Sequence, residues 1–473
     1  MDKQDLGLVF IVVLVLGYTG YAIAQPFQSP GVGGGGGTSP IELGARPCDF
    51  HFSIDSLYHA TNCLTGNKAR SGPIFATIFA DTISQCPATG CKLTFGRGPF
   101  SITTTLTLDR PVTLQGMGAG LLWNAGEDAP TELKWAGSSN NIPLLQITDT
   151  TLSEGITVKD LKLFYSGSTT GTDGIYIDGV TSVARRIDFY NVNIQSFTGY
   201  CVNAIGTTFD IHYFSLGCMS SAGLGGVLVN PGAGTPSQHF FYGPIIIENV
   251  AGAWAMNITS ASQSAIFGGT VANGLAGGNG LFLKGLNGFT AYNVNFEGAN
   301  AASTTGILYD GTGMTVQGGT INDWATGINI GPSPSGAASA TNWYVDSNFN
   351  SNTADVLITA GGSRNGILGP ISDNTLSTIT NNRATTDGVY SELLRIPLIP
   401  PGVASITPGA SPYTHTNQDF YKETIYISGG TVSGVTKSGS TVCSATNCAV
   451  FLAPGQSLIV TYSVLPTMIK DRY

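Results

Sequence analysis

The chain has 473 residues, of which 10% are charged and 64 are glycine, with a net charge of −9 and a pI near 4.9. An average soluble domain is roughly 25% charged, so the composition argues against long charged helices and favours short strands joined by tight turns. Without a cluster of Lys and Arg, no nucleic-acid partner is expected, and anionic membrane surfaces are poor candidate partners. The length allows a large core in more than one domain.

Residues 1–24 are predicted to be a signal peptide or an N-terminal membrane anchor. Leu6 to Ala24 is uncharged and mostly apolar, and Ala22-Ile23-Ala24 has the small-x-small form of a cleavage site. As a helix this segment would span roughly 28 Å, close to a bilayer core, and the residues before it are not net basic, so an uncleaved anchor is the alternative. Both interpretations predict an extracellular or cell-surface protein.

The next two segments are a linker and a cap. Residues 25–40 include the stretch SPGVGGGGGTSP, which has no capacity to pack and predicts a flexible linker. Residues 41–105 are expected to form an N-terminal capping region. Within it, a short amphipathic helix should begin at Ile74 and end near Cys86.

The eight cysteines fall into four sequence-local pairs. Zinc binding would need Cys-x-x-Cys or histidine spacing, which is absent. An even number of closely spaced cysteines favours disulfides made in an oxidising compartment, although spacing leaves their connectivity open. The pairs are Cys48/Cys63, Cys86/Cys91, Cys201/Cys218 and Cys443/Cys448.

Residues 106–394 are predicted to form a β-solenoid. Two ladders of apolar positions recur there every 20 to 35 residues or so, and turns stacked about 4.8 Å apart would join them into one core. The first ladder is Leu163, Ile194, Leu216, Ile247, Val271, Phe296, Ile321, Phe349 and Ile371. The second ladder consists of strands starting at Gly174, Gly199, Gly226, Ala253, Gly280, Gly306, Gly327 and Asp355, and the Asn203, Asn230 and Asn257 that follow three of them are expected to stack in left-handed turns.

The opening turns of this solenoid resemble those of the pectin-lyase-like β-helix superfamily. The segments that carry the resemblance are Phe95-Gly-Arg-Gly-Pro-Phe-Ser-Ile-Thr, Leu106-Thr-Leu and Val112-Thr-Leu-Gln-Gly-Met-Gly. The resemblance covers roughly residues 65–375 and implies an all-β, right-handed parallel β-helix. It leaves the activity open, because members include polysaccharide lyases, glycoside hydrolases, viral tailspikes and non-catalytic adhesins.

Residues 395–473 are predicted to form a small C-terminal β-sandwich. Alternating strand patterns with Gly and Pro turns are seen in Ile427-Ser-Gly-Gly-Thr-Val-Ser and Val460-Thr-Tyr-Ser-Val-Leu-Pro, after a Pro-rich linker over Ile396 to Pro412. This module is similar to C-terminal modules of virion and tail-fibre-like surface proteins.

Known catalytic signatures of the superfamily are missing. The polygalacturonase pattern has no match, the acidic and basic residues of a pectate lyase cannot be assembled, and no Ser-His-Asp or metal spacing occurs. No cofactor is implied, although calcium at an acidic turn stays open.

When the rungs of the first ladder are aligned, one group of carboxylates falls at equivalent positions. Glu248, Glu297 and Asp323 follow it at outward positions, with Glu297 and Asp323 expected one rung apart. Carboxylates roughly 5 to 10 Å apart suit the acid and base of glycoside cleavage, whereas solvent-facing turns often carry acidic residues without any function. A second cluster, Asp178, Arg185, Arg186 and Asp188, is interpreted as surface salt bridges.

A carbohydrate-binding face is expected beside the first ladder. Its outward column is polar, and aromatic side chains close to it could stack on pyranose rings. The expected binding residues are Asn295, Tyr292, Trp324, Trp343 and Tyr344. The outward column of the second ladder is apolar instead, which favours cover by a loop or by another subunit, so a side-by-side homotrimer is a hypothesis. Its members are Tyr176, Leu228, Ala255, Phe282, Leu308 and Leu357.

Two functions therefore remain. The first is an exported, adhesin- or spike-like β-helix protein that binds polysaccharide, a cell-surface glycan or a surface partner. The alternative is a polysaccharide-degrading hydrolase or lyase that uses the outward carboxylates Glu248, Glu297 and Asp323.

Overall fold

The computed structural model describes residues 48–120, 129–148, 155–219, 223–232, 237–248, 253–259, 263–273, 278–284, 288–299, 301–331, 340–359, 363–368, 379–381, 389–390, 403–417, 422–453 and 455–472. The expected signal or anchor and the linker, residues 1–40, lie outside these ranges, as does Ile371 of the first ladder. No helix among the described residues is long and apolar enough to cross a membrane.

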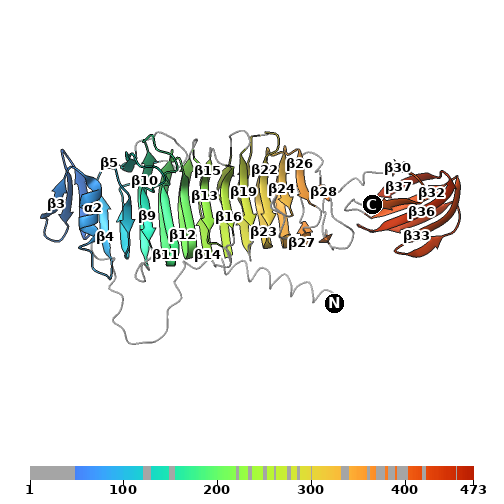
Figure 1. Cartoon of the computed structure of the whole chain (residues 1–473), viewed down its shortest axis with the longest axis horizontal. Helices are drawn as coiled ribbons and strands as arrows, with labels where there is room; N and C mark the ends of the chain where they lie inside the picture. The colour runs from blue at the N-terminus through green and yellow to red at the C-terminus, as the bar shows by residue number, and fades with distance from the viewer. Residues whose placement is uncertain are drawn as a thin grey trace, which may run out of the picture. The chain divides into compact units, whose positions relative to one another are not determined.

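Parallel strands stack in three ladders and form a right-handed parallel β-helix (Figure 1). We call the ladders sheet 1, sheet 2 and sheet 3, in the order in which each turn of the chain meets them. One complete turn runs through β13 in sheet 1, β14 in sheet 2 and β15 in sheet 3, and β16 then returns to sheet 1 beside β13. The predicted fold class is therefore confirmed.

Sheet 1 contains β6 (Leu106–Leu108), β9 (Leu145–Thr148), β13 (Gly225–Asn230), β16 (Trp254–Thr259), β19 (Asn279–Lys284), β22 (Thr305–Asp310), β24 (Thr326–Ile330), β26 (Ala354–Ile358) and β28 (Ile379–Asn381). Sheet 2 contains β1 (Phe50–Ile54), β4 (Cys91–Phe95), β7 (Val112–Gln115), β14 (Ser237–Tyr242), β17 (Gln263–Phe267), β20 (Phe289–Tyr292), β27 (Ser363–Leu368) and β29 (Val389–Tyr390). Sheet 3 contains β5 (Gly98–Ile102), β8 (Thr131–Trp135), β15 (Ile246–Glu248), β18 (Thr270–Ala272) and β21 (Asn295–Glu297).

Long strands pass from one sheet into the next. β10 (Ile156–Tyr165), β23 (Thr312–Asn322) and β25 (Ala340–Asn350) run from sheet 2 into sheet 3, and β11 (Ile175–Gln195) and β12 (Tyr200–Met219) run through all three.

The first predicted ladder is the inward column of sheet 3, with one error of register. Ile194 pairs with Cys218 and not with Leu216, because Leu216 lies one inward position earlier, opposite Val192. Cys218 then leads to Ile247, and the remaining steps follow the prediction. The column is fully buried and consists of Leu163, Ile194, Cys218, Ile247, Val271, Phe296, Ile321 and Phe349.

The second predicted ladder is sheet 1, where two rungs are displaced by two residues. Tyr176 pairs with Asn203, and Leu228 pairs with Asn257, so both asparagines lie in mid-strand and not in left-handed turns. Ala255, expected on the outside, is fully buried instead. Three asparagines therefore stand among the apolar side chains of the outward column and interrupt the apolar stripe behind the homotrimer hypothesis. Its members are Tyr176, Asn203, Leu228, Asn257, Phe282, Leu308, Asn329 and Leu357.

A left-handed residue follows the sheet 2 strand and turns the chain into sheet 3 on successive rungs, and on two rungs a second left-handed glycine, Gly269 or Gly319, comes after it. Only glycine, asparagine, aspartate and a few other polar residues adopt this conformation readily, and all seven residues at this corner are of these kinds. Asn191 also donates a hydrogen bond to the carboxylate of Asp160 on the preceding rung, at 3.1 Å. The corner consists of Asp160, Asn191, Ser215, Gly243, Gly268, Asn293 and Gly318.

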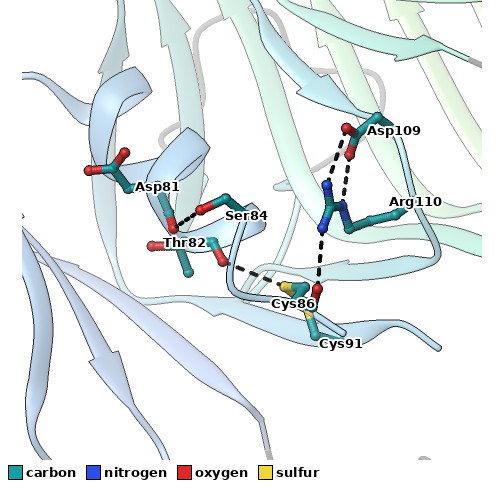
Figure 2. Close-up of polar contacts among 7 residues, drawn as sticks. All are labelled: Asp81, Thr82, Ser84, Cys86, Cys91, Asp109 and Arg110. Carbon is teal, nitrogen blue, oxygen red and sulfur yellow. Dashed lines mark hydrogen bonds and ion pairs between the residues drawn. A yellow bond between two sulfur atoms is a disulfide. The ribbon is translucent and has the colours of Figure 1, made fainter. Parts of the chain in front are cut away.

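The N-terminal end of the solenoid is covered by the helix α2 (Phe75–Ile83), as predicted, and by the antiparallel strands β2 (Tyr58–Asn62) and β3 (Lys68–Gly72). Phe75 and Phe79 of the helix pack on Phe52 of the first strand. Figure 2 shows how the end of α2 is held: Arg110 pairs with Asp109 and donates to the carbonyl of Cys86.

All four predicted disulfides are present: Cys48–Cys63, Cys86–Cys91, Cys201–Cys218 and Cys443–Cys448. Such bonds form and persist in oxidising compartments. They therefore fit the expected extracellular location.

Two antiparallel sheets form the C-terminal sandwich, around a core of their own that includes Ile425, Val435, Val450 and Leu458. One contains β30 (Val403–Ile406), β37 (Thr467–Arg472), β32 (Glu423–Ser428) and β35 (Cys448–Leu452), in that order. The other contains β31 (Tyr413–Thr416), β36 (Ser457–Val464), β33 (Thr431–Lys437) and β34 (Ser440–Cys443).

Candidate functional site

The predicted carboxylates lie on the outer face of sheet 3. Glu248 ends β15 and Glu297 ends β21, and Ala272 occupies the rung between them. Since neighbouring strands are about 4.8 Å apart, the two backbones are roughly 10 Å apart. We call this region the acidic patch; it comprises Glu248, Asn295, Glu297, Thr320, Asn322 and Asp323.

Asp323 does not take its predicted place beside Glu297. The residue opposite Glu297 is Asn322, and Asp323 comes one position later, in a left-handed turn with φ of 63°. Because a shift of one residue sends a strand side chain to the other face, only this turn keeps Asp323 near the patch. Asn322 donates a hydrogen bond to its carboxylate at 3.0 Å.

Hydrogen bonds join the patch across two rungs. Asn295 donates to Glu297 at 3.4 Å, and the hydroxyl of Thr320 donates to the side-chain oxygen of Asn295. Thr320 also contacts Asn322 at 3.5 Å. Glu297 and Asp323 therefore belong to one network, although amides and a hydroxyl separate them.

The charge of Glu297 acts on Glu248. Burial, and then the negative charge of Glu297, raises the pKa of Glu248 above its ordinary value. A carboxyl group with a raised pKa beside an exposed carboxylate is the arrangement expected of a general acid and its partner.

Two of the predicted sugar-binding residues are in the core. Trp324 and Trp343 are 0% and 1% exposed, so neither ring can stack on a ligand. The indole of Trp324 donates inward to the carbonyl of Phe296, and Trp343 continues an inward column of sheet 2 beside Met314. Trp343 was expected outside because sheet 2, where it faces the core, lacks a clear alternation of apolar and polar residues in the sequence.

The other predicted residues do reach the surface. Tyr292 is 45% exposed at the end of β20, and Tyr344 is half-buried on β25, where its hydroxyl donates to Asp346 at 3.1 Å. Tyr292 and Asn295 stand on either side of the left-handed corner residue Asn293. The outer faces of sheets 2 and 3 therefore meet between these two side chains.

Sheet 2 carries an aromatic ladder that the sequence predictions missed. Successive rungs place aromatic rings at the last outward position before the corner, and the first three contacts are stacked with ring centroids 4.6, 5.0 and 5.3 Å apart. Three of the five residues are more than a third exposed. We call this ladder the aromatic stripe; it consists of Tyr190, Phe214, Tyr242, Phe267 and Tyr292.

A sequence signal for the stripe does exist. Each of its aromatic residues directly precedes a corner residue, giving Tyr-Asn, Phe-Ser, Tyr-Gly, Phe-Gly and Tyr-Asn about every 25 residues. An aromatic side chain followed by a residue that tolerates a left-handed turn therefore marks the end of five consecutive sheet 2 segments.

His212 lies next to the stripe, between two carboxylates. Its Nδ1 is 2.9 Å from Asp188, and its Nε2 is 3.2 Å from Asp210. The hydrogen bond to Asp188 raises the pKa of His212, partial burial opposes this, and the charges of both aspartates add to the rise. Asp188, assigned from sequence to a cluster with Asp178, Arg185 and Arg186, thus has His212 as a partner.

Other features offer less for a site. Among the described residues, no group of three or more His, Cys, Asp or Glu could hold a metal ion. A hollow between α2 and the turn at Asp109 is lined by Phe79 and Ile83, and its Arg110 is already paired with Asp109. The acidic patch and the aromatic stripe are therefore the candidate functional surfaces.

Comparisons with known proteins leave the family unassigned. No sequence profile of a known family matches the chain, and no curated protein matches it. The chain is similar in structure to the A-module of the mannuronan C-5 epimerase AlgE6 of Azotobacter vinelandii, at 16% identity and a TM-score of 0.44, over 67% of this chain and 86% of that one.

Two further solved structures are similar at lower scores. Tailspike protein 3 of bacteriophage CBA120 has 11% identity and a TM-score of 0.35, over 86% of this chain and 73% of that one. The PL6 family alginate lyase AlyGC has 11% identity and a TM-score of 0.32, over 67% and 53%. The fold itself, a parallel β-helix, follows from the strand register described above.

Proposed function

We propose that this protein is an exported β-helix protein that binds polysaccharide along the outer faces of sheets 2 and 3. The observation that carries the proposal is the aromatic stripe, whose exposed end at Tyr292 adjoins the hydrogen-bonding side chains of Asn295 and Thr320. Sugar rings combine apolar C–H faces with hydroxyl groups, so aromatic and amide side chains side by side suit them.

The length of the surface favours a polymer over a small ligand. The stripe extends over five rungs of about 4.8 Å each, and small-molecule sites are concave and enclose most of their ligand. A repetitive chain can make the same contact on every rung, which gives many weak contacts at once. This interpretation agrees with an adhesin- or spike-like role at a cell or virion surface.

The alternative function, polysaccharide cleavage, is favoured by one observation. Glu248 has a raised pKa and shares its column with Glu297, roughly two rungs away, a separation that leaves room for a water molecule between acid and base in an inverting hydrolase. In this case Glu248 would be the general acid and Glu297 the base.

The test is a screen of the purified chain against a panel of polysaccharides. Binding would be supported if the unaltered chain retains a polysaccharide and Tyr292→Ala retains less of it. In this case no new reducing or unsaturated ends should appear. New reducing ends that disappear in both Glu248→Gln and Glu297→Gln would establish the hydrolase instead. Absence of both binding and cleavage across neutral and acidic polymers would reject the proposed function.

A further inference from the structure

The three rungs that carry Tyr242, Phe267 and Tyr292 of the aromatic stripe are almost free of charge. Between Asp210 and Asp346 the chain contains five charged residues, Glu248, Lys284, Glu297, Asp310 and Asp323, and only Lys284 is positive. Lys284 lies in sheet 1, opposite Asp310 and away from the stripe. The strands β14, β17 and β20 contain no Asp, Glu, Lys or Arg at all.

We propose that the ligand of the aromatic stripe is a neutral polysaccharide that lies extended along sheet 2, parallel to the solenoid axis. This inference rests on the proposed function and names its ligand class. It separates this chain from proteins that act on polyuronates, since recognition of carboxylates relies on Arg or Lys in charge-assisted hydrogen bonds.

The charges around the C-terminal end of the stripe would repel a polyanion. Asp346 follows the stripe in the same column after Gln317, and Glu297 and Glu248 lie across the corner on sheet 3. At the other end, Lys159 precedes Tyr190 in the same column, and His212 lies between Asp188 and Asp210. Beside Tyr242, Phe267 and Tyr292, an acidic sugar chain would therefore meet these carboxylates, and β14, β17 and β20 contain no Lys or Arg to offset them.

Side-chain size shows where the chain would lie. The outward column next to the stripe changes from Phe240 to the small residues Ala265, Thr290 and Thr315, and becomes large again at Tyr344. Over these three rungs the rings of Phe267 and Tyr292 stand beside short side chains. This change in side-chain size forms a step along the surface. A sugar chain lying in the step would have Phe267 and Tyr292 as an apolar flank on one side and the hydroxyls of Thr290 and Thr315 beneath it.

The ring geometry also determines the kind of contact. The first four rings of the stripe stack on one another, so they present their edges and not their faces to a ligand. Tyr292 is the exception at the C-terminal end, because the next rung carries Gln317 in place of a ring. We expect Tyr292 to supply a stacking platform next to the short side chains, and Phe214, Tyr242 and Phe267 to supply an apolar edge.

The order of residues along the stripe suits a chain with a repeat of two sugars. Tyrosine and phenylalanine alternate, so a phenolic hydroxyl recurs every second rung, or about 10 Å. One pyranose of an extended chain is close to one rung in length. An extended polymer in which every second sugar shows the same edge would therefore match this pattern.

The experiment compares a neutral β-1,4-linked glucose hexasaccharide and a neutral xylose hexasaccharide with oligogalacturonate and oligo-alginate of equal length. Binding to the full chain is measured by calorimetry at low and high salt. We expect a neutral chain to bind with an affinity that hardly changes with salt, because no ion pair is involved. Thr290→Trp, which fills the step, and Tyr292→Ala should each weaken binding about tenfold or more.

Tyr176→Ala and Leu228→Ala are the matched controls, since both residues face outward from sheet 1. Far-ultraviolet circular dichroism confirms that all variants fold. Preferential binding of the acidic oligosaccharides, lost at high salt, would overturn the neutral-ligand inference and keep the proposed function. Binding of no oligosaccharide or polymer would overturn both, and a change of oligomeric state in Tyr292→Ala would identify the stripe as an interface between copies and overturn the inference.

Discussion

Glu248 and Glu297 lie in one outward column of sheet 3, separated only by the rung that carries the methyl group of Ala272. The small side chain lets each carboxylate experience the other. Burial contributes most to the raised pKa of Glu248, and the charge of Glu297 contributes next.

We therefore expect the pKa of Glu248 to fall in Glu297→Gln while it stays above its ordinary value. The charge disappears and the burial remains. A carbon-13 NMR titration of the Glu248 carboxyl group measures this. Asp346→Asn, on sheet 2, is the control and should leave Glu248 unchanged; an equal shift in both variants would contradict the direct interaction.

The pKa of His212 is expected to fall in Asp188→Asn, because the hydrogen bond to Asp188 is the largest cause of its rise. A proton NMR titration of the imidazole measures the shift. Asp178→Asn is the control, since Asp178 lies in sheet 1 and its carboxylate accepts from the backbone of Val180. A His212 pKa that is unaltered in Asp188→Asn would show that the pair does not form in solution.

The same pair predicts how stability depends on pH. A histidine with a raised folded-state pKa contributes stability that is complete below the unfolded value of 6.5 and is lost as the pH rises through the folded value. Asp188→Asn should thus lower the free energy of unfolding more at about pH 5.5 than at about pH 9. Urea unfolding at the two pH values tests the sign of this difference.

Much of the fold could be predicted from the sequence. Apolar residues must face the core on every turn, so sheets 1 and 3 appear as periodic columns. The errors of register arose between apolar residues that lie close together in the sequence. Leu216 and Cys218 are both apolar and both buried, so periodicity could not decide which one pairs with Ile194. The displaced rungs of sheet 1 have the same cause.

Sheet 2 was not predicted, and most errors at the candidate site follow from that. Its strands carry large aromatic side chains on both faces, as in Phe240, Phe241 and Tyr242, so the alternation of apolar and polar residues that marks a half-buried strand is missing. Trp343 was therefore placed outside, while Phe267 was overlooked. The carboxylates Glu248 and Glu297, which follow a clear inward column, were positioned well.

Because of His239, the folded protein is expected to lose stability in acid. It is fully buried between Thr208 and Tyr213, and burial lowers its pKa to about 3 from 6.5. The unfolded chain therefore binds a proton that the folded chain does not between these values, so stability falls as the pH drops below 6.5, by up to about 1.4 kcal/mol per pH unit. His239→Gln should make the free energy of unfolding less dependent on pH in this range.

The control for this measurement is His51→Gln, because His51 lies near the N-terminal cap and is only partly buried. Guanidinium unfolding of the two variants and the unaltered chain is compared between about pH 4 and pH 7. An equally steep pH dependence in His239→Gln would mean that another group causes the acid sensitivity.

The disulfide Cys201–Cys218 is expected to stabilise the solenoid more than Cys86–Cys91 does. It joins positions 17 residues apart, against 5 for the other bond. Since a disulfide restricts the unfolded chain more when it closes a longer loop, removal should cost about 3 kcal/mol for the first and about 2 kcal/mol for the second.

Cys201 and Cys218 are also both 0% exposed, so Cys201→Ala with Cys218→Ala leaves an unfilled space in the core as well. Thermal unfolding of the two double variants gives the order. A larger loss for the Cys86 and Cys91 pair would show that holding the end of α2 over the first rungs matters more than loop closure inside the solenoid.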